Sequence, residues 1–567
     1  MWNRGVDVHN DTQHQVLTTC TYISFPEREN LLDFIPTFLP FLPFNSCIRT
    51  LRLIYKIKMS SIDDTAEVPP LFTLPSELIH HILSFLQWQD LLAVGLASRA
   101  LHEHSQQDTL YHQIVQDNVP DSIVRKPANL SWRELFIQHH PYWFIVKKRI
   151  WFADNPHTGK LIVARYDHRI NAIEAYTLMA ERRQPAFQTW EWNPDAIIHT
   201  FHPRIQLDLN QPMVRLNQYG YENSDRSIQN RLQREIQMHL SNESTRPSAG
   251  LYSSIMLARP WPAGITTEAT PIWPLLTIPS SSRTRTDSST HFRNIGNRPS
   301  SLSELSTGTF RMRRWMEFWS PRQHIGSVRV GEEITTWATL PEESYTPTPQ
   351  KPWQGIWCGD YAGHGCEFLA IMQPDEPQPL PLQAERAMRS REREGSVSSD
   401  GSWSTAPTDA TEEWEDEFGD DFDHSSADSS SLGDSAATLH AAVNTAGERK
   451  GFSQDSWSSS NDETKYRGRI EAVKLTGDPN IPRGEYTFIA PDIGPNGLIR
   501  VATEELFKGA RIVKSVGHIA ARGFRDQDYM PSQLILISHD RLAQYWETFG
   551  HVSFYQRVNV EEFTRIP

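Results

Sequence analysis

The segment from Leu74 to Ser105 carries more apolar residues than a single amphipathic helix needs. Within Leu78–Leu86, the apolar positions are Leu78, Ile79, Ile82, Leu83, Phe85 and Leu86. At about 100° per residue, these side chains cover more than one face of a helix. The pattern therefore predicts either a helix buried on all sides or a helix that serves both its own small core and the groove of a partner.

Helix-start and helix-stop residues divide this segment into short helices. Pro75 suits the start of a helix because its missing N–H is not needed there, and Glu77 follows in the first turn. Asp90 is expected to cap a second helix, whose apolar residues are Leu91, Leu92, Leu96 and Leu101. A third helical piece spans residues 109–115. Residues 71–118 are thus predicted to form a bundle so small that it needs a partner to be stable.

Beyond Trp132 the pattern changes to the mixture of β-branched and aromatic residues that is typical of strands. Such segments lie at residues 141–152, 161–178 and 196–209. Ser224–Leu240 is the exception, because Ile228, Leu232, Ile236 and Leu240 form a single stripe that predicts a helix. Residues 119–279 are therefore interpreted as a linker and the first strand-rich part of a larger domain, with one helix.

Alternating apolar segments return at Trp353–Pro374 and again after residue 465, separated by turn signals such as Gly477-Asp478-Pro479-Asn480. They predict a closed antiparallel sheet built from residues 307–374 and 465–567. Two polar stretches are expected to be disordered: the Ser/Arg/Thr-rich residues 280–306 and the acidic, Ser-rich residues 375–464. The predicted fold class is α+β and multidomain, with a small all-α bundle, a mainly antiparallel, barrel-like β domain and long disordered inserts.

Composition supports this division. A chain of 567 residues suggests several domains, and 38% apolar residues is low enough to leave part of it unfolded. The 18 Trp, 25 Phe and 16 Tyr still suffice for a sizeable core. Of the net charge of −14, twelve Asp and Glu lie in Asp400–Asp434, which has no Lys or Arg, so the rest of the chain carries only −2. The acidity belongs to the insert, and nothing favours nucleic acid as a partner.

The N-terminal 70 residues are expected to be disordered or dispensable. Leu31–Phe44 is apolar but too short to span a bilayer as a helix, and it contains three prolines and Asp33. A signal peptide is not expected so far from the start of the chain. Met59 opens a segment that looks like an ordinary N-terminus, which suggests that residues 1–58 are an upstream extension. A weak membrane-surface anchor is the alternative.

No pattern of catalytic or metal-binding residues stands out. Four scattered cysteines lack zinc-type spacing and indicate a reducing compartment, cytoplasmic or nuclear. The pairs His80-His81 and His139-His140 are expected to be solvated helix positions. The cluster Arg311–Trp319 is interpreted as arginines packed on aromatics rather than as a phosphate site. No catalytic residue, cofactor, metal or small-molecule substrate is predicted.

The helical segment resembles the F-box. The resemblance rests on Leu74-Pro75, Glu77-Leu78, Ile82-Leu83, Phe85-Leu86, Asp90-Leu91-Leu92, Ser98-Arg99 and Leu110-Tyr111. It implies docking onto the Skp adaptor and, through it, onto cullin and RING subunits of a ubiquitin ligase. The residues implied in adaptor binding are Leu74, Pro75, Leu78, Ile79, Ile82, Leu83, Phe85, Leu86, Leu91, Leu92, Leu96 and Leu101. A helix with two apolar faces is what this double task requires.

The C-terminal part is similar to the substrate domain of the F-box only protein thirty-one group, in Gly359–Met372, Glu471–Phe488 and His518–Val558. That resemblance implies a β-barrel with a cleft for short degrons at chain ends. The candidate cleft residues are Tyr361 and His364, beside a glycine-rich hairpin, and Asp478 and Asn480, on a turn expected to be exposed. The chain is thus expected to be a substrate receptor of a Skp–cullin–F-box (SCF) ligase. A scaffold for the adaptor alone and a membrane-peripheral adaptor are the alternatives.

Overall fold

The computed structural model describes residues 70–153, 159–182, 187–199, 201–224, 227–238, 249–260, 297–318, 328–360, 365–396 and 465–566. The expectations for residues 1–58 and for Asp400–Asp434 lie outside these ranges. Within them, no helix is long and apolar enough to cross a membrane. The chain divides into two compact units between Leu110 and Tyr111.

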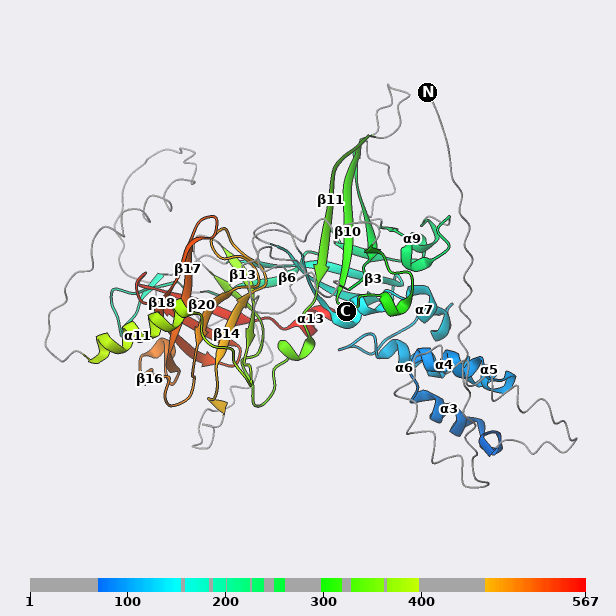
Figure 1. The fold of residues 1–567 in the computed structure, drawn as a ribbon, viewed down its shortest axis with the longest axis horizontal. Coiled ribbons are helices and arrows are strands. Elements are labelled where there is room, and N and C mark those ends of the chain that lie inside the picture. Colours follow the sequence, from blue (N-terminus) through cyan, green and yellow to red (C-terminus); the bar gives the residue numbers. More distant parts are fainter. Residues whose placement is uncertain are drawn as a thin grey trace, which may run out of the picture. The chain divides into compact units, whose positions relative to one another are not determined.

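The first unit is a set of short helices, as predicted (Figure 1). They are η3 (Pro70–Thr73), α3 (Ser76–Ser84), α4 (Trp88–Gly95) and α5 (Arg99–Ser105), and α6 (Asp108–Gln116) begins at the end of the unit. Ser98 caps α5 by accepting the N–H of Leu101 at 3.2 Å. A Cβ atom on Gly95 would stand 2.5 Å from Ser105 Oγ, so the glycine allows α4 and α5 to approach closely.

Two details of that prediction are wrong. Asp90 lies in the first turn of α4 and does not cap it, because Gln87 occupies the N-cap. The second predicted helix is also two helices, since α4 ends at Gly95 and Ser98 starts α5.

The second unit opens with two helices, α7 (Trp132–His139) and α8 (Trp143–Lys148). Residues 141–148 were expected to be extended, but four consecutive buried apolar side chains, from Trp143 to Val146, fit a helix buried on all sides equally well. Ser131 and Glu134 form a reciprocal capping box at the start of α7. The strands begin only at Ile150.

A nine-stranded sheet follows, in the order β6-β3-β2-β1-β11-β10-β9-β8, with β7 paired to β3. Its strands are β1 (Ile150–Ala153), β2 (Leu161–Asp167), β3 (Ala172–Glu181), β6 (Arg204–Leu207), β7 (Val214–Leu216), β8 (Ile236–Met238), β9 (Ala249–Leu257), β10 (Thr309–Phe318) and β11 (Val328–Ala338). All pairings in it are antiparallel. The short helix α9 (Gln218–Glu222) precedes β8.

The helix predicted over Ser224–Leu240 is wrong. Its described part holds a 3-10 turn, η4 (Arg231–Gln233), and strand β8. Ile236 and Met238 are buried on one side of that strand, where Ile236 pairs with Ile255 of β9.

The expected disordered loop 280–306 is also ordered from residue 297 onward. There Arg298 is buried and forms an ion pair with Glu235 at 3.1 Å; residues 280–296 lie outside the described ranges.

The second sheet contains the predicted closed barrel. Its eight strands are β12 (Gly355–Asp360), β13 (Cys366–Met372), β14 (Ile470–Lys474), β15 (Tyr486–Ala490), β17 (Arg511–Ala521), β18 (Arg525–Ser538), β19 (Arg541–Trp546) and β20 (His551–Arg557). Neighbours pair antiparallel in this order, and β12 pairs with β20 to close the ring. The segments on the two sides of the acidic insert therefore form one barrel, as expected.

Alternation along the strands gives the barrel two buried surfaces. Side chains such as Trp357, Leu369 and Tyr555 belong to the interior cluster. Their neighbours Ile356 and Phe368 point outward and join a second cluster with residues of β1, β2 and β3. The nine-stranded sheet is thus packed on the outside of the barrel wall.

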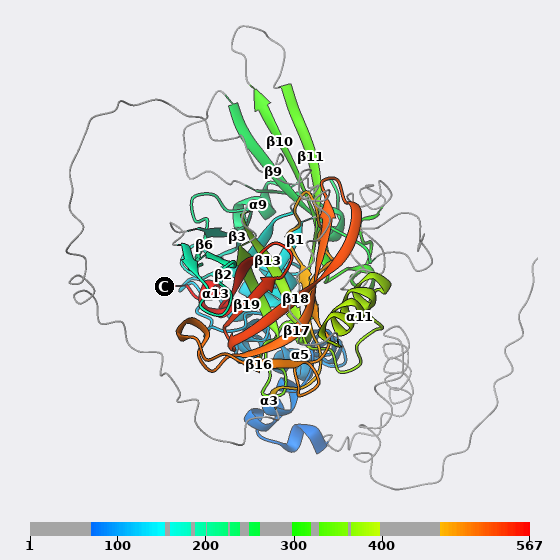
Figure 2. The same cartoon turned by 90° about the vertical axis from the view of Figure 1, so that its left-hand side faces the viewer.

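Part of the expected disordered insert is a helix on the barrel. Helix α11 (Leu382–Ser396) buries Ala384 and Ala387 against Ile489 and Val516, and Figure 2 shows it along β17 and β18. The insert boundary expected at Asp375 is therefore wrong, and residues 397–464 lie outside the described ranges.

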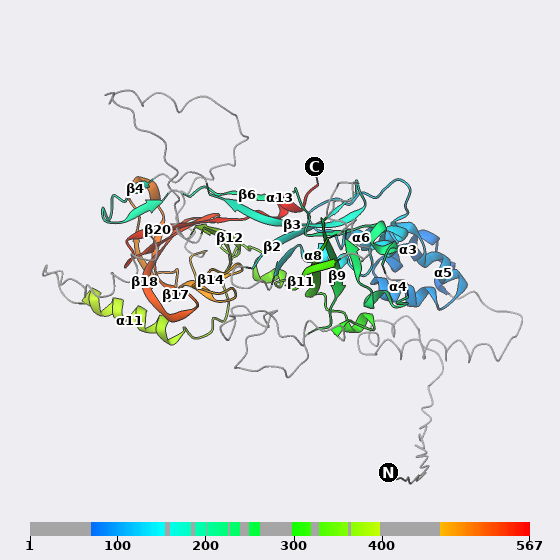
Figure 3. The ribbon, with the colours of Figure 1, turned by 90° about the horizontal axis from the view of Figure 1, so that it is seen from above.

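A short hairpin joins the barrel at β20. It consists of β4 (Phe187–Thr189) and β5 (Ile197–His199), and β5 runs parallel to β20 at His551 and Val552 (Figure 3). The β12 strand pairs with β20 only from Tyr555 onward, so the hairpin occupies the remaining edge. Strand β16 (Leu498–Val501) and the 3-10 turn η11 (Glu505–Phe507) precede β17 in the chain.

Candidate functional site

The first unit presents a row of large apolar side chains to solvent. Phe85 is 77% exposed, Leu96 78%, Leu78 49% and Ile82 45%. The complete exposed set among the predicted adaptor contacts is Leu74, Pro75, Leu78, Ile82, Phe85, Leu92 and Leu96. So many large apolar side chains exposed on one small unit are typical of a protein-binding surface. We call these residues the F-box apolar face.

The remaining predicted contacts have a different role. Ile79, Leu83 and Leu91 are buried in the described structure, and Leu86 and Leu101 are half-buried. Helix α3 therefore does carry two apolar faces, one buried and one exposed, as its sequence pattern required. Ile79, Leu83 and Leu91 support the exposed face without belonging to it.

The expectation that the histidine pairs are solvated holds for His81 and is wrong for His139. His80 Nε2 lies 3.0 Å from Nδ1 of His104, so it is engaged between α3 and α5, whereas His81 is exposed. His139 is fully buried, with its two ring nitrogens 3.0 Å from Tyr221 Oη and Asn171 Oδ1. Burial lowers the pKa of His139 to about 4, so it is a neutral core residue at pH 7.

The turn after β14 is buried, which corrects the expectation that it exposes Asp478. Asp478 is 4% exposed, and its carboxylate accepts hydrogen bonds from Lys474 Nζ and from the backbone N–H of Asn480. Lys474 is also buried, and its Nζ lies 2.7 Å from the carboxylate of Glu367 on β13. One ammonium and two carboxyl groups thus share one end of the barrel.

The charge balance of this trio depends on Glu367. Burial raises the pKa of the Glu367 carboxyl to about 8, despite the neighbouring Lys474. Glu367 is therefore largely protonated at neutral pH, and Lys474 is balanced mainly by Asp478. Asn480 is half-buried and donates from its side chain to the carbonyl of Ala520 at 2.7 Å. Tyr361 and His364 lie outside the described residues, between the end of β12 and the start of β13.

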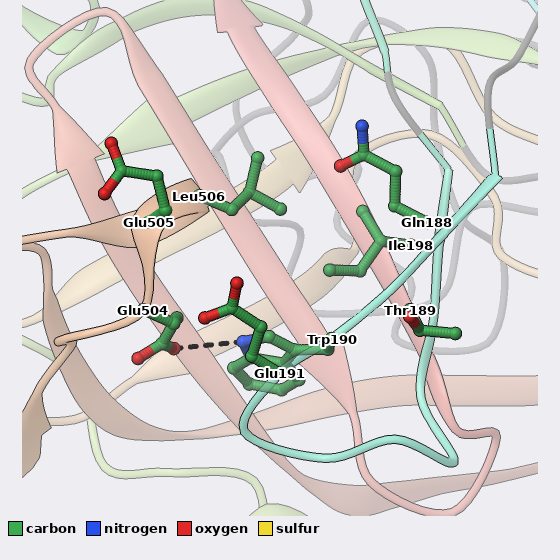
Figure 4. A pocket seen from close by; sticks show the side chains of 8 residues that line it. All are labelled: Gln188, Thr189, Trp190, Glu191, Ile198, Glu504, Glu505 and Leu506. Carbon is green, nitrogen blue, oxygen red and sulfur yellow. Dashed lines mark hydrogen bonds between the residues drawn. The ribbon is translucent and has the colours of Figure 1, made fainter.

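A pocket of about 420 Å³ lies where the β4–β5 hairpin meets η11. It is lined by Gln188, Thr189, Trp190, Glu191, Ile198, Glu504, Glu505 and Leu506. Figure 4 shows Glu505 and Leu506 on one side, Gln188 and Ile198 on the other, and Trp190 and Glu191 between them. We call it the hairpin pocket.

Trp190 and Glu504 tie the two walls of this pocket together. The Trp190 indole N–H donates to Glu504 at 3.0 Å, and Arg500 donates to both oxygens of the same carboxylate at 2.9 and 2.8 Å. These bonds from Arg500 lower the pKa of Glu504 to about 2. These residues could not be predicted from the sequence, because the two walls are more than 300 residues apart in the chain. The only local signal is the sequence Trp190-Glu191-Trp192.

A second cavity, of about 660 Å³, lies between η7 (Glu342–Ser344), the end of β20 and α13 (Val560–Thr564). Its charged groups are largely paired with one another. Arg149 bonds to Asp121 at 2.6 Å and to Glu342, and Arg557 lies 3.0 Å from Asp540.

The cysteines and the arginine cluster flagged by the sequence lie on strands of the two sheets. Cys358 and Cys366 are free thiols on the outer face of β12 and β13. Arg311 is buried, and Arg313 forms ion pairs with Glu235 at 3.0 Å and Glu332 at 2.5 Å, in line with a structural role. Among the described residues, no three or more His, Cys, Asp or Glu side chains are grouped as a metal site.

Comparison with known protein families agrees with this division of the chain. A family profile described as F-box-like matches residues 71–117. A second profile, described as the cyclin D1 binding domain, matches residues 337–562 and so covers the whole barrel. No curated protein matches the sequence. The F-box match confirms the first resemblance, and the second match is consistent with the F-box only protein thirty-one group.

Proposed function

We propose that this F-box protein is the substrate receptor of an SCF ubiquitin ligase. An F-box gives the chain a substrate-adaptor role of the SCF type in general, with binding to the Skp adaptor and its ligase complex. The more specific proposal is that the F-box apolar face docks the adaptor while the barrel and its hairpin hold a substrate. The chain then supplies proximity, and the transfer chemistry belongs to its partners.

The observation that carries the proposal is the exposure of the F-box apolar face. Phe85 and Leu96 are more than three-quarters exposed. Burying one such side chain fully contributes roughly 1.5–3 kcal/mol. Leu78, Ile82 and Phe85 lie on or directly after α3, so one adaptor groove can cover all three.

The substrate side of the proposal rests on the barrel. The matching profile is named for binding cyclin D1, so a D-type cyclin is the first substrate to test. A short degron near a chain terminus remains the expected recognition element, as the resemblance to the chain-end receptors implies. Among the candidate cleft residues that the structure describes, Asn480 is half-buried at the end of the barrel. Cys358 and Cys366, the two cysteines that the structure describes, are free thiols, which supports a reducing compartment; we propose the cytoplasm or nucleus.

The test replaces Leu78, Ile82 and Phe85 by alanine in the full chain and measures co-purification of the adaptor and cullin. A matched control replaces three exposed residues of the same types outside the F-box: Leu382, Ile123 and Phe549. We expect the first variant to lose both partners and the control to keep them. Undiminished adaptor binding by the first variant contradicts the assignment. Retention of the adaptor without cullin in the wild type contradicts the ligase role and favours a scaffold.

A further inference from the structure

The hairpin pocket combines an apolar lining with an excess of negative charge. Trp190, Ile198 and Leu506 supply the apolar surface, and Glu191, Glu504 and Glu505 supply carboxylates. None of the residues that line the pocket is Lys, Arg or His. At about 420 Å³ the pocket is within the usual size range of ligand sites, near its lower end.

The nearby cations are already engaged or exposed. Arg500 is held by Glu504, and the face of its guanidinium is covered by the ring of Trp192, with the carbon at 3.7 Å from the ring centre. Lys508 lies 3.5 Å from Glu505, but both side chains are largely exposed, so the pair is weak. Glu191 is exposed and forms no ion pair among the described residues. Glu191 and Glu505 therefore remain available to an incoming cation.

The pocket is also held rigidly from behind. The Trp190 ring packs edge-on against Tyr545 at 5.1 Å and Phe507 at 5.7 Å between ring centres. The side chain of Asn193 donates to the hydroxyl of Tyr545 at 2.7 Å, which fixes the turn of the hairpin on β19. A site that is already formed loses little entropy on binding.

We propose that the hairpin pocket binds a long cationic side chain, arginine or lysine, on an exposed loop of a partner protein. The aliphatic stem packs on Ile198 and Leu506, and the charged head group donates hydrogen bonds to Glu191 and Glu505. If the proposed function holds, the partner is the substrate, and the pocket is a second contact distinct from the barrel end. The binding itself does not depend on the adaptor.

The test measures fluorescence anisotropy of a labelled cyclic peptide, closed head to tail, that carries one arginine. This probe has no chain terminus, so capture of a terminus at the barrel end cannot contribute. Two further probes carry citrulline or glutamate in place of arginine. Citrulline keeps the shape of arginine and removes its charge. The full chain, with or without its adaptor, is expected to bind the arginine peptide, and to bind the other two at least about tenfold more weakly.

The matched variants are Glu191→Gln with Glu505→Gln, and, as control, Glu343→Gln with Glu376→Gln. All four residues are exposed, so neither double variant should affect folding. We expect the first to weaken binding of the arginine peptide about tenfold, the loss expected from two exposed ion pairs, and the control to leave it unchanged. The proposal is overturned if the first variant binds the arginine peptide as tightly as the wild type does. It is also overturned if the wild type binds the citrulline peptide as tightly as the arginine peptide. Failure of adaptor co-purification would refute the ligase role and leave this result standing.

Discussion

Replacing Asp478 by alanine should destabilise the barrel, although the residue lies in a turn. Its carboxylate is 4% exposed and accepts from the buried Lys474 ammonium and from the backbone N–H of Asn480 at 2.6 Å. Removing one partner of a buried ion pair costs roughly 3–5 kcal/mol, and each backbone N–H left without its acceptor costs about 1 kcal/mol more. Glu367 stands 2.7 Å from Lys474 and can ionise in compensation, which offsets part of the loss.

The net expectation is a loss of about 3 kcal/mol in the free energy of unfolding. Urea unfolding followed by tryptophan fluorescence measures it, because Trp353, Trp357 and Trp546 lie in the barrel. Asp478→Asn is the matched variant: it keeps an oxygen for the backbone N–H groups but loses the charge and the second oxygen that accepts from Lys474, so it should fall between wild type and Asp478→Ala. A midpoint for Asp478→Ala within error of wild type would refute the buried ion-pair account and restore Asp478 as a surface residue.

Three further predictions test the barrel and its boundaries. With a pKa of about 8 in the folded state and an ordinary value of 4.5, Glu367 holds a proton that the unfolded chain loses, so stability falls as pH rises from 4.5 to 8. Glu367→Gln should remove that fall, and parallel melting-temperature profiles for the two proteins would contradict it. Deleting residues 397–464 should leave the melting temperature nearly unchanged. Deleting residues 375–464 should lower it, because α11 is lost as well. Equal melting temperatures for the two deletion variants would contradict the packing of α11 on the barrel. Gly517→Ala should cost about 1–3 kcal/mol in urea unfolding, because its Cβ would stand 2.2 Å from the Trp546 ring; an unchanged midpoint would show that the ring shifts freely.

The sequence predicted the elements whose signals are local. The F-box helices follow from caps and apolar spacing within about forty residues, and the barrel strands follow from their alternation between turns. The failures arise where one pattern fits two structures. The stripe over Ser224–Leu240 fits a helix, yet Ile236 is buried as part of a strand that pairs with β9. Likewise, the apolar run from Trp143 to Val146 forms a buried helix, although its sequence pattern is also typical of a strand.

The candidate substrate site was harder to predict, because its environment is assembled from distant segments. Asp478 lies in a sequence that is typical of an exposed turn, and only its contact with Lys474, which also reaches Glu367 on β13, shows that it is buried. Lys474 is only four residues from Asp478, but its burial beside Glu367 depends on the pairing of β13 with β14, which the local sequence does not show. Similarly, the indole of Trp190 finds its acceptor in Glu504, and no local pattern links the two.

The position of the hairpin pocket suggests how recognition and stability are separated in this domain. In a closed barrel every strand edge is paired, which leaves no backbone to hold an additional element. The β20 strand is one exception, because β12 covers its edge from Tyr555 onward and β5 covers it at His551 and Val552. The β17 strand is another, because β15 pairs with it at Val516 and Gly517 and β16 pairs with it at residues 511–513. The hairpin is therefore attached outside the ring, and its exposed residues Gln188, Thr189 and Glu191 do not belong to the barrel interior. Substitutions at these positions should alter what the pocket binds without disturbing the interior packing of the barrel.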